Sequence, residues 1–180
     1  MKEVSIIILL LFVLLGCKTH CPEFPANLNY FPYYEGQELK FTNSKQNIRI
    51  FIVSYKEDSK AYSFAWNCKC DCSAESGFHT TESQDSLSIK AAFFRFSGEK
   101  YISSVDIGFR FQYSYMYGDD LRITLGIEKS VPYDEIYKYL EDTIIIENEN
   151  NQLVKKVVIV KGKGLVSYTT ADGEEWKLVE

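Results

Sequence analysis

Cysteine is the residue type in this sequence whose spacing most directly implies chemistry. Three cysteines occupy alternate positions, Cys68, Cys70 and Cys72, and a fourth, Cys21, lies near the start of the chain. Thiols placed in this way can form disulfides, bind a soft metal or exchange electrons. An even number of cysteines in an oxidising compartment favours two disulfides, so we predict that these four residues are disulfide-bonded.

The spacing leaves the pairing open. On a straight strand, residues two apart have Cα atoms about 6.6 Å apart, which is at the limit for a disulfide. Cys68 and Cys72 are four residues apart, which is too far on a straight strand, so their pairing is disfavoured. A bond from Cys21 to Cys68 or Cys72 is the simplest scheme. Metal binding and redox exchange remain alternatives, although Cys-x-Cys-x-Cys is not a zinc spacing and the sequence has no Cys-x-x-Cys.

Other catalytic groups are few. There are two histidines, and His79 lies in a polar stretch where we expect it to be solvated. No Gly-x-Ser-x-Gly, HExxH or phosphate-loop motif occurs. We interpret Asp119 and Asp120 as part of a hairpin turn. These observations predict a non-enzymatic protein with no cofactor and no metal, and an envelope hydrolase that uses carboxylates is the alternative.

Composition limits the partners. The chain has 180 residues, which suits one domain, and its net charge of −5 argues against a nucleic-acid partner. Aromatic residues make up 15% of the chain, and a domain of this size can bury a sizeable core without disulfides. We therefore expect disulfides to fix local geometry rather than to replace a core.

The first seventeen residues have the pattern of a secretion signal. Residues 6–15 form an unbroken apolar run of ten, about half the length that a membrane-spanning helix needs. The ending Leu14-Leu15-Gly16-Cys17 resembles the bacterial lipobox. That resemblance implies cleavage before Cys17, which would carry a diacylglycerol thioether and an N-acyl chain such as palmitate. We predict a signal peptide at 1–16, a lipid anchor and tether at 17–29, and one domain at 30–180.

The residues after Cys17 bear on location. Lys18, rather than Asp, follows the cysteine, and the sorting rules of lipoproteins then imply the outer membrane. Lys18-Thr19-His20 contains no acidic residue to resemble a surface-export signal, so we expect the domain to face the periplasm. The segment 30–37, with the ending 160–166, is similar to small uncharacterised β-rich lipoproteins of the Bacteroidota type. That similarity implies a curved antiparallel sheet.

Alternation of apolar and polar residues predicts strands along most of the chain. We expect strands at 62–72, 87–91, 105–117 and 121–127, followed by a C-terminal meander over 143–147, 153–160, 165–170 and 176–179. Residues 48–55 are apolar on both faces, which predicts a covered central strand. Residues 73–88 are polar and predict an exposed loop.

One short helix is predicted after Ser130, which could cap it, with Pro132 in the first turn. The fold class is thus mainly β, either a curved antiparallel sheet or a sandwich or half-barrel, with at most one short helix. Antiparallel strands commonly have one apolar face, which packs on the core, and one polar face, which meets solvent.

The aromatic face of residues 105–117 changes from Phe to Tyr along its length, which indicates a wetter far end. Packing in the core is one reading of this face, and a cavity for a small hydrophobic or glycan ligand is the other. Tyr113, Tyr115 and Tyr117 are the ligand-binding candidates. We hypothesise a membrane-anchored binding or envelope-structural module, with a carrier of lipid or another hydrophobic ligand as the alternative. A protein partner is not specified by the sequence.

Overall fold

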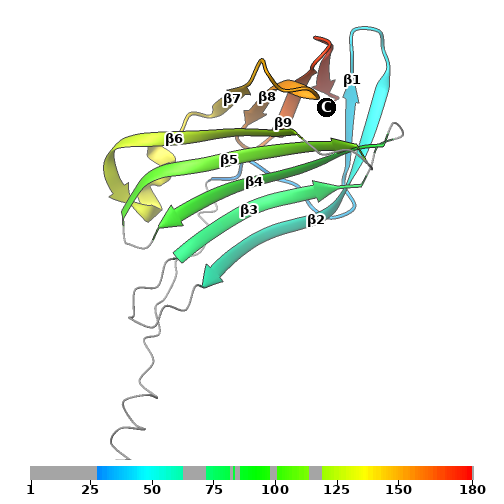
Figure 1. Cartoon of the computed structure of the whole chain (residues 1–180). Coiled ribbons are helices and arrows are strands. Elements are labelled where there is room, and N and C mark those ends of the chain that lie inside the picture. Colours follow the sequence, from blue (N-terminus) through cyan, green and yellow to red (C-terminus); the bar gives the residue numbers. More distant parts are fainter. Residues whose placement is uncertain are drawn as a thin grey trace, which may run out of the picture.

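Ten antiparallel strands form one sheet in a computed structural model of the chain (Figure 1). The structure describes residues 28–62, 72–81, 83, 86–97, 101–113 and 119–179. In chain order the strands are β1 Glu38–Thr42, β2 Ile48–Tyr62, β3 Cys72–Thr80, β4 Leu87–Ser97, β5 Tyr101–Tyr113, β6 Asp119–Pro132, β7 Thr143–Glu147, β8 Val154–Val160, β9 Gly164–Thr170 and β10 Glu175–Leu178.

The order of strands across the sheet is β6-β5-β4-β3-β2-β1-β10-β9-β8-β7. Each strand pairs with its neighbour in sequence, and β10 returns to pair with β1 through Phe41 and Leu178. Only the step from β6 to β7 lacks pairing among the described residues, and there the two strands approach each other. The sheet is therefore nearly closed into a barrel-like shape, with the long strands β2–β6 as one curved layer (Figure 1).

The mainly β class and the C-terminal meander are confirmed. β-branched residues dominate β7 and β8, and turns separate these strands. Gly173 has φ +84°, which the Asp172-Gly173 turn between β9 and β10 requires. The predicted strands at 87–91 and 121–127 lie within β4 and β6. The predicted strand at 105–117 is confirmed to Tyr113, where the described part of β5 ends.

Two strand predictions were wrong. Residues 73–88 were expected to be an exposed loop, yet Cys72–Thr80 forms β3, where Phe78 is fully buried. Thr80 of β3 is also buried, and its hydroxyl accepts a hydrogen bond from the backbone N–H of Ile89 at 2.9 Å. Residues 48–55 were expected to be covered on both faces, but Ile48 is 49% exposed. β2 has a strand on each side of it and the interior beneath it, whereas its outer face meets solvent.

The predicted helix is present in a shorter form. A 3₁₀ helix, η1, spans Tyr133–Lys138 and buries Ile136. β6 continues to Pro132, so Ser130 belongs to a strand and does not cap the helix. The cause is tertiary: Val131 is buried and pairs with Ile102 of β5, which keeps this stretch in the sheet.

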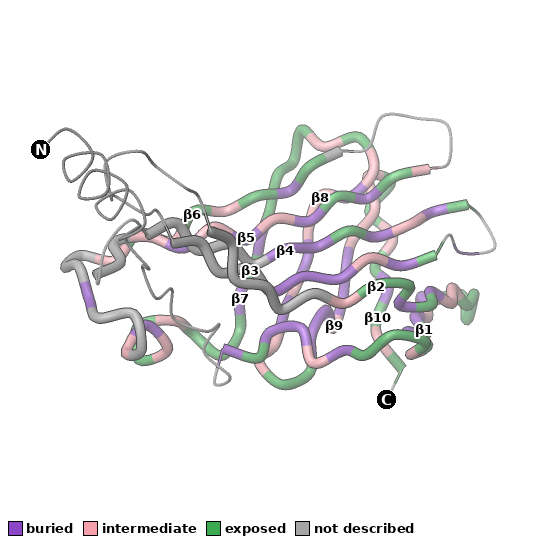
Figure 2. Tube along the Cα trace, turned by 90° about the horizontal axis from the view of Figure 1, so that it is seen from below, coloured by how far each residue is buried: buried purple, intermediate pink, exposed green. Residues whose placement is uncertain are grey.

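Aromatic rings fill the space inside the sheet, and buried and exposed residues alternate along the strands around it (Figure 2). The segment before β1, residues 28–33, which we call the entry segment, contributes to this core. Phe31 meets the rings of Phe78 and Phe109 edge-on, with ring centroids 5.3 and 5.7 Å apart. From the other side of the interior, Tyr168 of β9 lies 5.4 Å from Phe111. The chain therefore enters the core before it forms its first strand.

Tyr33 fixes the end of the entry segment. Its hydroxyl accepts a hydrogen bond from the backbone N–H of Leu165 at 2.6 Å. Burial raises the pKa of Tyr33 well above its usual range. Gly164, with φ +87°, makes room for this contact, because a Cβ there would stand 2.0 Å from the Tyr33 hydroxyl. Gly164 therefore lets the entry segment approach β9 closely.

Candidate functional site

A hollow on the outer face of β4, β5 and β6 combines charge with open space. Its volume is about 190 Å³, and we call it the outer hollow. Its lining residues are Lys90, Ala92, Gly108, Phe109, Arg110, Asp120, Leu121 and Arg122. A pocket of this size is smaller than the range typical of sites for drug-sized ligands. It suits a single small group rather than a long chain.

The register of the sheet assembles this site. Ala92 of β4, Gly108 of β5 and Arg122 of β6 are directly opposite one another, so they form one row across the outer face. Lys90, Arg110 and Asp120 form the adjacent row. Because side chains alternate between faces, all six point outward while Phe109 and Leu121 point into the core.

Small residues make the floor of the outer hollow. Ala92 is 4% exposed and Gly108 has no side chain, so no side chain projects from the floor between the longer residues around it. A Cβ at Gly108 would come within 3.7 Å of Arg122 Nε, which shows that the Arg122 side chain lies close over β5. The row continues on β3 to Gly77, where a Cβ would stand 2.8 Å from the carbonyl oxygen of Ala91.

A paired arginine and aspartate form one wall. Arg110 donates to both carboxylate oxygens of Asp120, with Nε to Oδ1 at 2.6 Å and Nη2 to Oδ2 at 2.9 Å. This hydrogen-bonded fork holds the pKa of the Asp120 carboxyl below its usual range, and the positive charges of Arg122 and Lys90 lower that pKa further. Asp120 is therefore an ionised acceptor at neutral pH.

Lys90 and Arg122 differ from most lysines of the described surface. Six lysines elsewhere are each ion-paired with a carboxylate. They are Lys45, Lys138, Lys155, Lys156, Lys161 and Lys177. Within the described residues, no carboxylate lies within ion-pair distance of Lys90 or Arg122. Two cations thus remain available beside the Arg110–Asp120 pair.

The sequence did not single out the outer hollow. Asp120 was expected in a turn, but it pairs with Arg110 within the ladder of β5 and β6. His79 was expected in a loop, and it lies instead on β3, directly opposite Lys90, with its ring 5.6 Å from that of Tyr55. Register between strands creates the site, and the residues of one strand alone carry no signal for it.

Of the three predicted ligand residues, the structure describes Tyr113, which is partly buried and packs against the core beside the buried Phe109 and Phe111 of the same face. Tyr115 and Tyr117 lie outside the described residues, as do Cys17, Cys21, Cys68 and Cys70. Cys72 is the first residue of β3, and its side chain is likewise outside the description. The lipidation and disulfide predictions therefore stay predictions.

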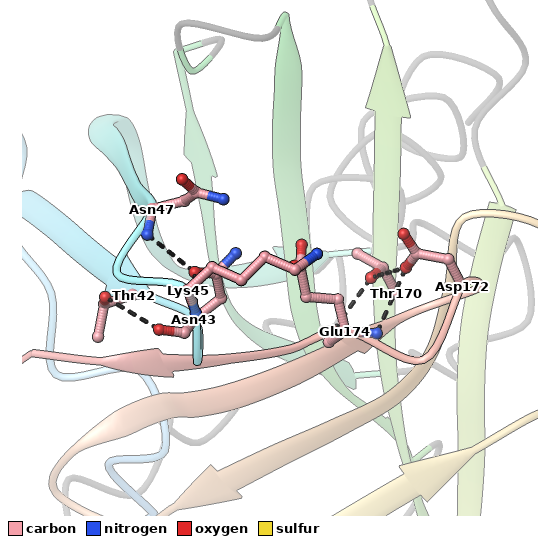
Figure 3. Close-up of polar contacts among 7 residues, drawn as sticks. All are labelled: Thr42, Asn43, Lys45, Asn47, Thr170, Asp172 and Glu174. Carbon is pink, nitrogen blue, oxygen red and sulfur yellow. Dashed lines mark hydrogen bonds and ion pairs between the residues drawn. The ribbon is translucent and has the colours of Figure 1, made fainter.

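A second polar cluster joins two turns at one end of the sheet (Figure 3). Asn43 Oδ1 accepts hydrogen bonds from the backbone N–H groups of Lys45 and Asn47, and this closes the turn between β1 and β2. Lys45 Nζ lies 3.0 Å from a carboxylate oxygen of Glu174 in the next turn, and it lowers the pKa of that carboxyl. These bonds satisfy the turns themselves, so we assign the cluster a structural role.

A third feature covers the core near those turns. Arg49 stacks over the ring of Trp176 at 4.0 Å and donates to the Tyr168 hydroxyl at 3.2 Å. Trp176 Nε1 is buried and has no hydrogen-bond partner among the described residues. The arginine connects β2 to β9 and β10 across β1, which stabilises the pairing of β1 with β10.

Comparisons with family models, with curated proteins and with solved structures return no match for this chain. Within the described residues, no three His, Cys, Asp or Glu side chains gather to hold a metal ion. Those residues also include no helix with the length and apolarity to cross a membrane.

Proposed function

We propose that this protein is a non-enzymatic binding module, anchored by a lipidated Cys17 to the outer membrane and facing the periplasm. The observation that carries the proposal is the outer hollow, where Lys90 and Arg122 have no carboxylate partner within the described part of the chain and lie beside a floor of small residues. Aromatic packing in the described interior supports a binding surface on the outside of the sheet.

The carboxylates at this face are unsuited to acid–base catalysis. A general acid needs a raised pKa, whereas the pKa of Asp120 is lowered by its fork with Arg110. The nearby Asp106 accepts a hydrogen bond from Thr124, directly opposite on β6. Each of these carboxylates is thus held by its own cross-strand partner, and this arrangement favours binding over the hydrolase alternative.

Covalent labelling of lysines tests the site without knowledge of the ligand. Intact cells and the protein purified in neutral detergent are treated with an amine-acylating reagent, and Lys90 and Lys40 are compared by mass spectrometry. Both side chains are exposed on the outer face of the sheet, but only Lys90 lines the outer hollow. We expect Lys90 to be protected in cells and reactive after purification, with Lys40 equally reactive in both. Equal reactivity of Lys90 in the two samples would contradict the proposal.

The anchor has a separate test. Replacement of Cys17 by Ser removes the acceptor of the lipid, so we expect the variant to leave the membrane fraction and the mature mass to lose the acyl groups. A Cys21→Ser variant is the control, because it removes a nearby thiol and keeps the lipobox. Retention of Cys17→Ser in the membrane at unchanged mass would rule out lipidation at this residue.

A second hollow favours a second candidate function, the carriage of a small hydrophobic ligand. It measures about 460 Å³ and is lined by Val160, Val166, Leu178 and Lys163. Three aliphatic side chains could hold an apolar group while the lysine faces its polar end. Native mass spectrometry after mild purification tests this function. An added lipid mass would support it, and bare protein would count against it.

A further inference from the structure

We propose that the outer hollow binds a sugar that carries a phosphate or a carboxylate. This inference rests on the proposed function, because it names the ligand class of the same site. Three cations from three strands line it, and the chain as a whole is acidic. A local excess of positive charge on an acidic protein selects an anion against the background of the remaining surface.

The arginines determine the shape of the anion. A guanidinium presents its N–H groups in a plane and binds phosphate or carboxylate oxygens in pairs. Arg110 uses Nε and Nη2 on Asp120, which fixes its orientation, while Arg122 across the floor retains its donors. Lys90 adds a third charge from β4. An oxyanion between Arg122 and Lys90 would replace their water with charge-assisted hydrogen bonds.

The remaining lining indicates that the anion is attached to a sugar. Asp120 is an ionised acceptor beside the donors of Arg110, and this pairing matches a hydroxyl group that both donates and accepts. Ala92 and Gly108 carry no side chain long enough to project from the floor, which leaves room for a ring between the charged groups. The volume of about 190 Å³ suits one ring.

Two variants remove the site in different ways. Arg122→Gln removes one charge from the lining, and Gly108→Val fills the floor without a change of charge. Each has a matched control on the outer face of the same sheet. Lys40→Gln removes an exposed cation from β1, and Gly126→Ala adds a side chain on β6 where nothing lies within 4 Å. Circular dichroism and thermal unfolding confirm that all four variants fold.

Isothermal titration calorimetry of the full mature protein in neutral detergent measures binding. The probes are glucose 6-phosphate, glucuronate, glucose and inorganic phosphate at low salt. We expect the two sugar anions to bind and the other two to bind about tenfold more weakly, because each lacks one half of the recognised group. Arg122→Gln and Gly108→Val should each weaken the sugar anions about tenfold, with wild-type affinity in both controls. Raising the ionic strength to about 0.5 M should weaken them as well.

Three results would overturn the inference. Equal affinity for inorganic phosphate and glucose 6-phosphate would remove the sugar from the ligand. Equal affinity for glucose would remove the anion, and binding that survives both Arg122→Gln and Gly108→Val would place the site elsewhere. The labelling of Lys90 separates this failure from that of the proposed function. A Lys90 protected in cells with no sugar-anion binding leaves the binding module in place and rejects its ligand class, whereas an unprotected Lys90 rejects both.

Discussion

The interior of the sheet and the outer hollow use the same strands for opposite purposes. On β5, Phe109 and Phe111 point inward to rings from the entry segment and from β9, where each ring has neighbours on several sides. Between them Arg110 points outward and has one cross-strand partner. Inward residues thus determine the stability of the fold, while outward residues at the hollow contribute little to it and are available for a ligand. Four predictions test this division.

The largest expected effect is on the interior. Phe78→Ala removes a fully buried ring that meets both Phe31 and Tyr33, so we expect a loss of about 3–5 kcal/mol in the free energy of unfolding. Urea denaturation of the purified protein measures it. Tyr55→Ala, on the outer face and 44% exposed, is the comparison and should cost about 1 kcal/mol or less. Similar losses in both variants would remove the contrast between the two faces.

The next effect isolates the contact between the entry segment and β9. Gly164→Ala and Gly173→Ala each place a side chain at positive φ, which costs about 1–2 kcal/mol. Only the first also meets the Tyr33 ring, so we expect it to cost a further 1–3 kcal/mol or so. The difference between the two unfolding free energies reports the steric term alone. If the two variants unfold at the same urea concentration, Tyr33 does not constrain β9.

A third effect depends on pH. Tyr30 is buried and its hydroxyl donates to the carbonyl of Glu141 at 2.6 Å. Burial, followed by the charges of Asp142 and Glu141, raises the pKa of Tyr30 from 10.0 to about 12. The folded pKa lies above the unfolded one, so this contribution to stability is complete below pH 10 and declines as the pH rises toward 12.

We expect the decline to be at most about 1.4 kcal/mol per pH unit. Unfolding in urea at pH 8, 10 and 11 should show a steeper loss for wild type than for Tyr30→Phe. Tyr139→Phe is the control, because this side chain is 55% exposed, and it should keep the wild-type slope. An identical slope in wild type and Tyr30→Phe would mean that Tyr30 ionises as freely as in the unfolded chain.

The smallest effect belongs to the outer hollow. Asp120→Asn breaks the fork with Arg110, but both side chains are about half exposed and water screens their attraction. We therefore expect a loss of about 0.2–1 kcal/mol at pH 7. The folded pKa of Asp120 is lowered, so this contribution exists above the unfolded pKa and disappears as the pH falls through the folded pKa. Urea unfolding of wild type and Asp120→Asn at pH 7 and pH 3 measures this loss at each pH. A loss above about 2 kcal/mol at pH 7 would show that the Arg110–Asp120 pair is important for the stability of the fold.

The sequence predicts those parts of the fold whose local chemistry is self-sufficient. The C-terminal meander is an example, because β-branched runs such as Thr143–Glu147 alternate with turn residues such as Gly173. β3 was missed because Ser76 and Thr80 face inward, and their partners, Lys56 Nζ and the backbone N–H of Ile89, come from other strands. From sequence alone, a polar residue is predicted to be exposed unless a buried hydrogen-bond partner for it is known.

The entry segment and the outer hollow depend on the assembled sheet. Phe31 has no periodic pattern around it, and its burial follows from rings on β3 and β5. Lys90, Arg110 and Arg122 are spread over 33 positions of sequence, from 90 to 122, and only the register of three strands brings them to one face. Single-sequence reasoning can assign a face to each residue within its strand, but it cannot align one strand with the next.

The bond from the backbone N–H of Leu165 to the Tyr33 hydroxyl joins residues 132 positions apart, and the pairing of Phe41 with Leu178 links the first and last described strands of the chain. Contacts between such distant residues slow folding, because the loop must close before either bond forms. Neither contact can form before β9 and β10 have been synthesised. Early folding should therefore be confined to local hairpins such as that of β8 and β9, and β1 lacks its second partner strand until β10 pairs with it.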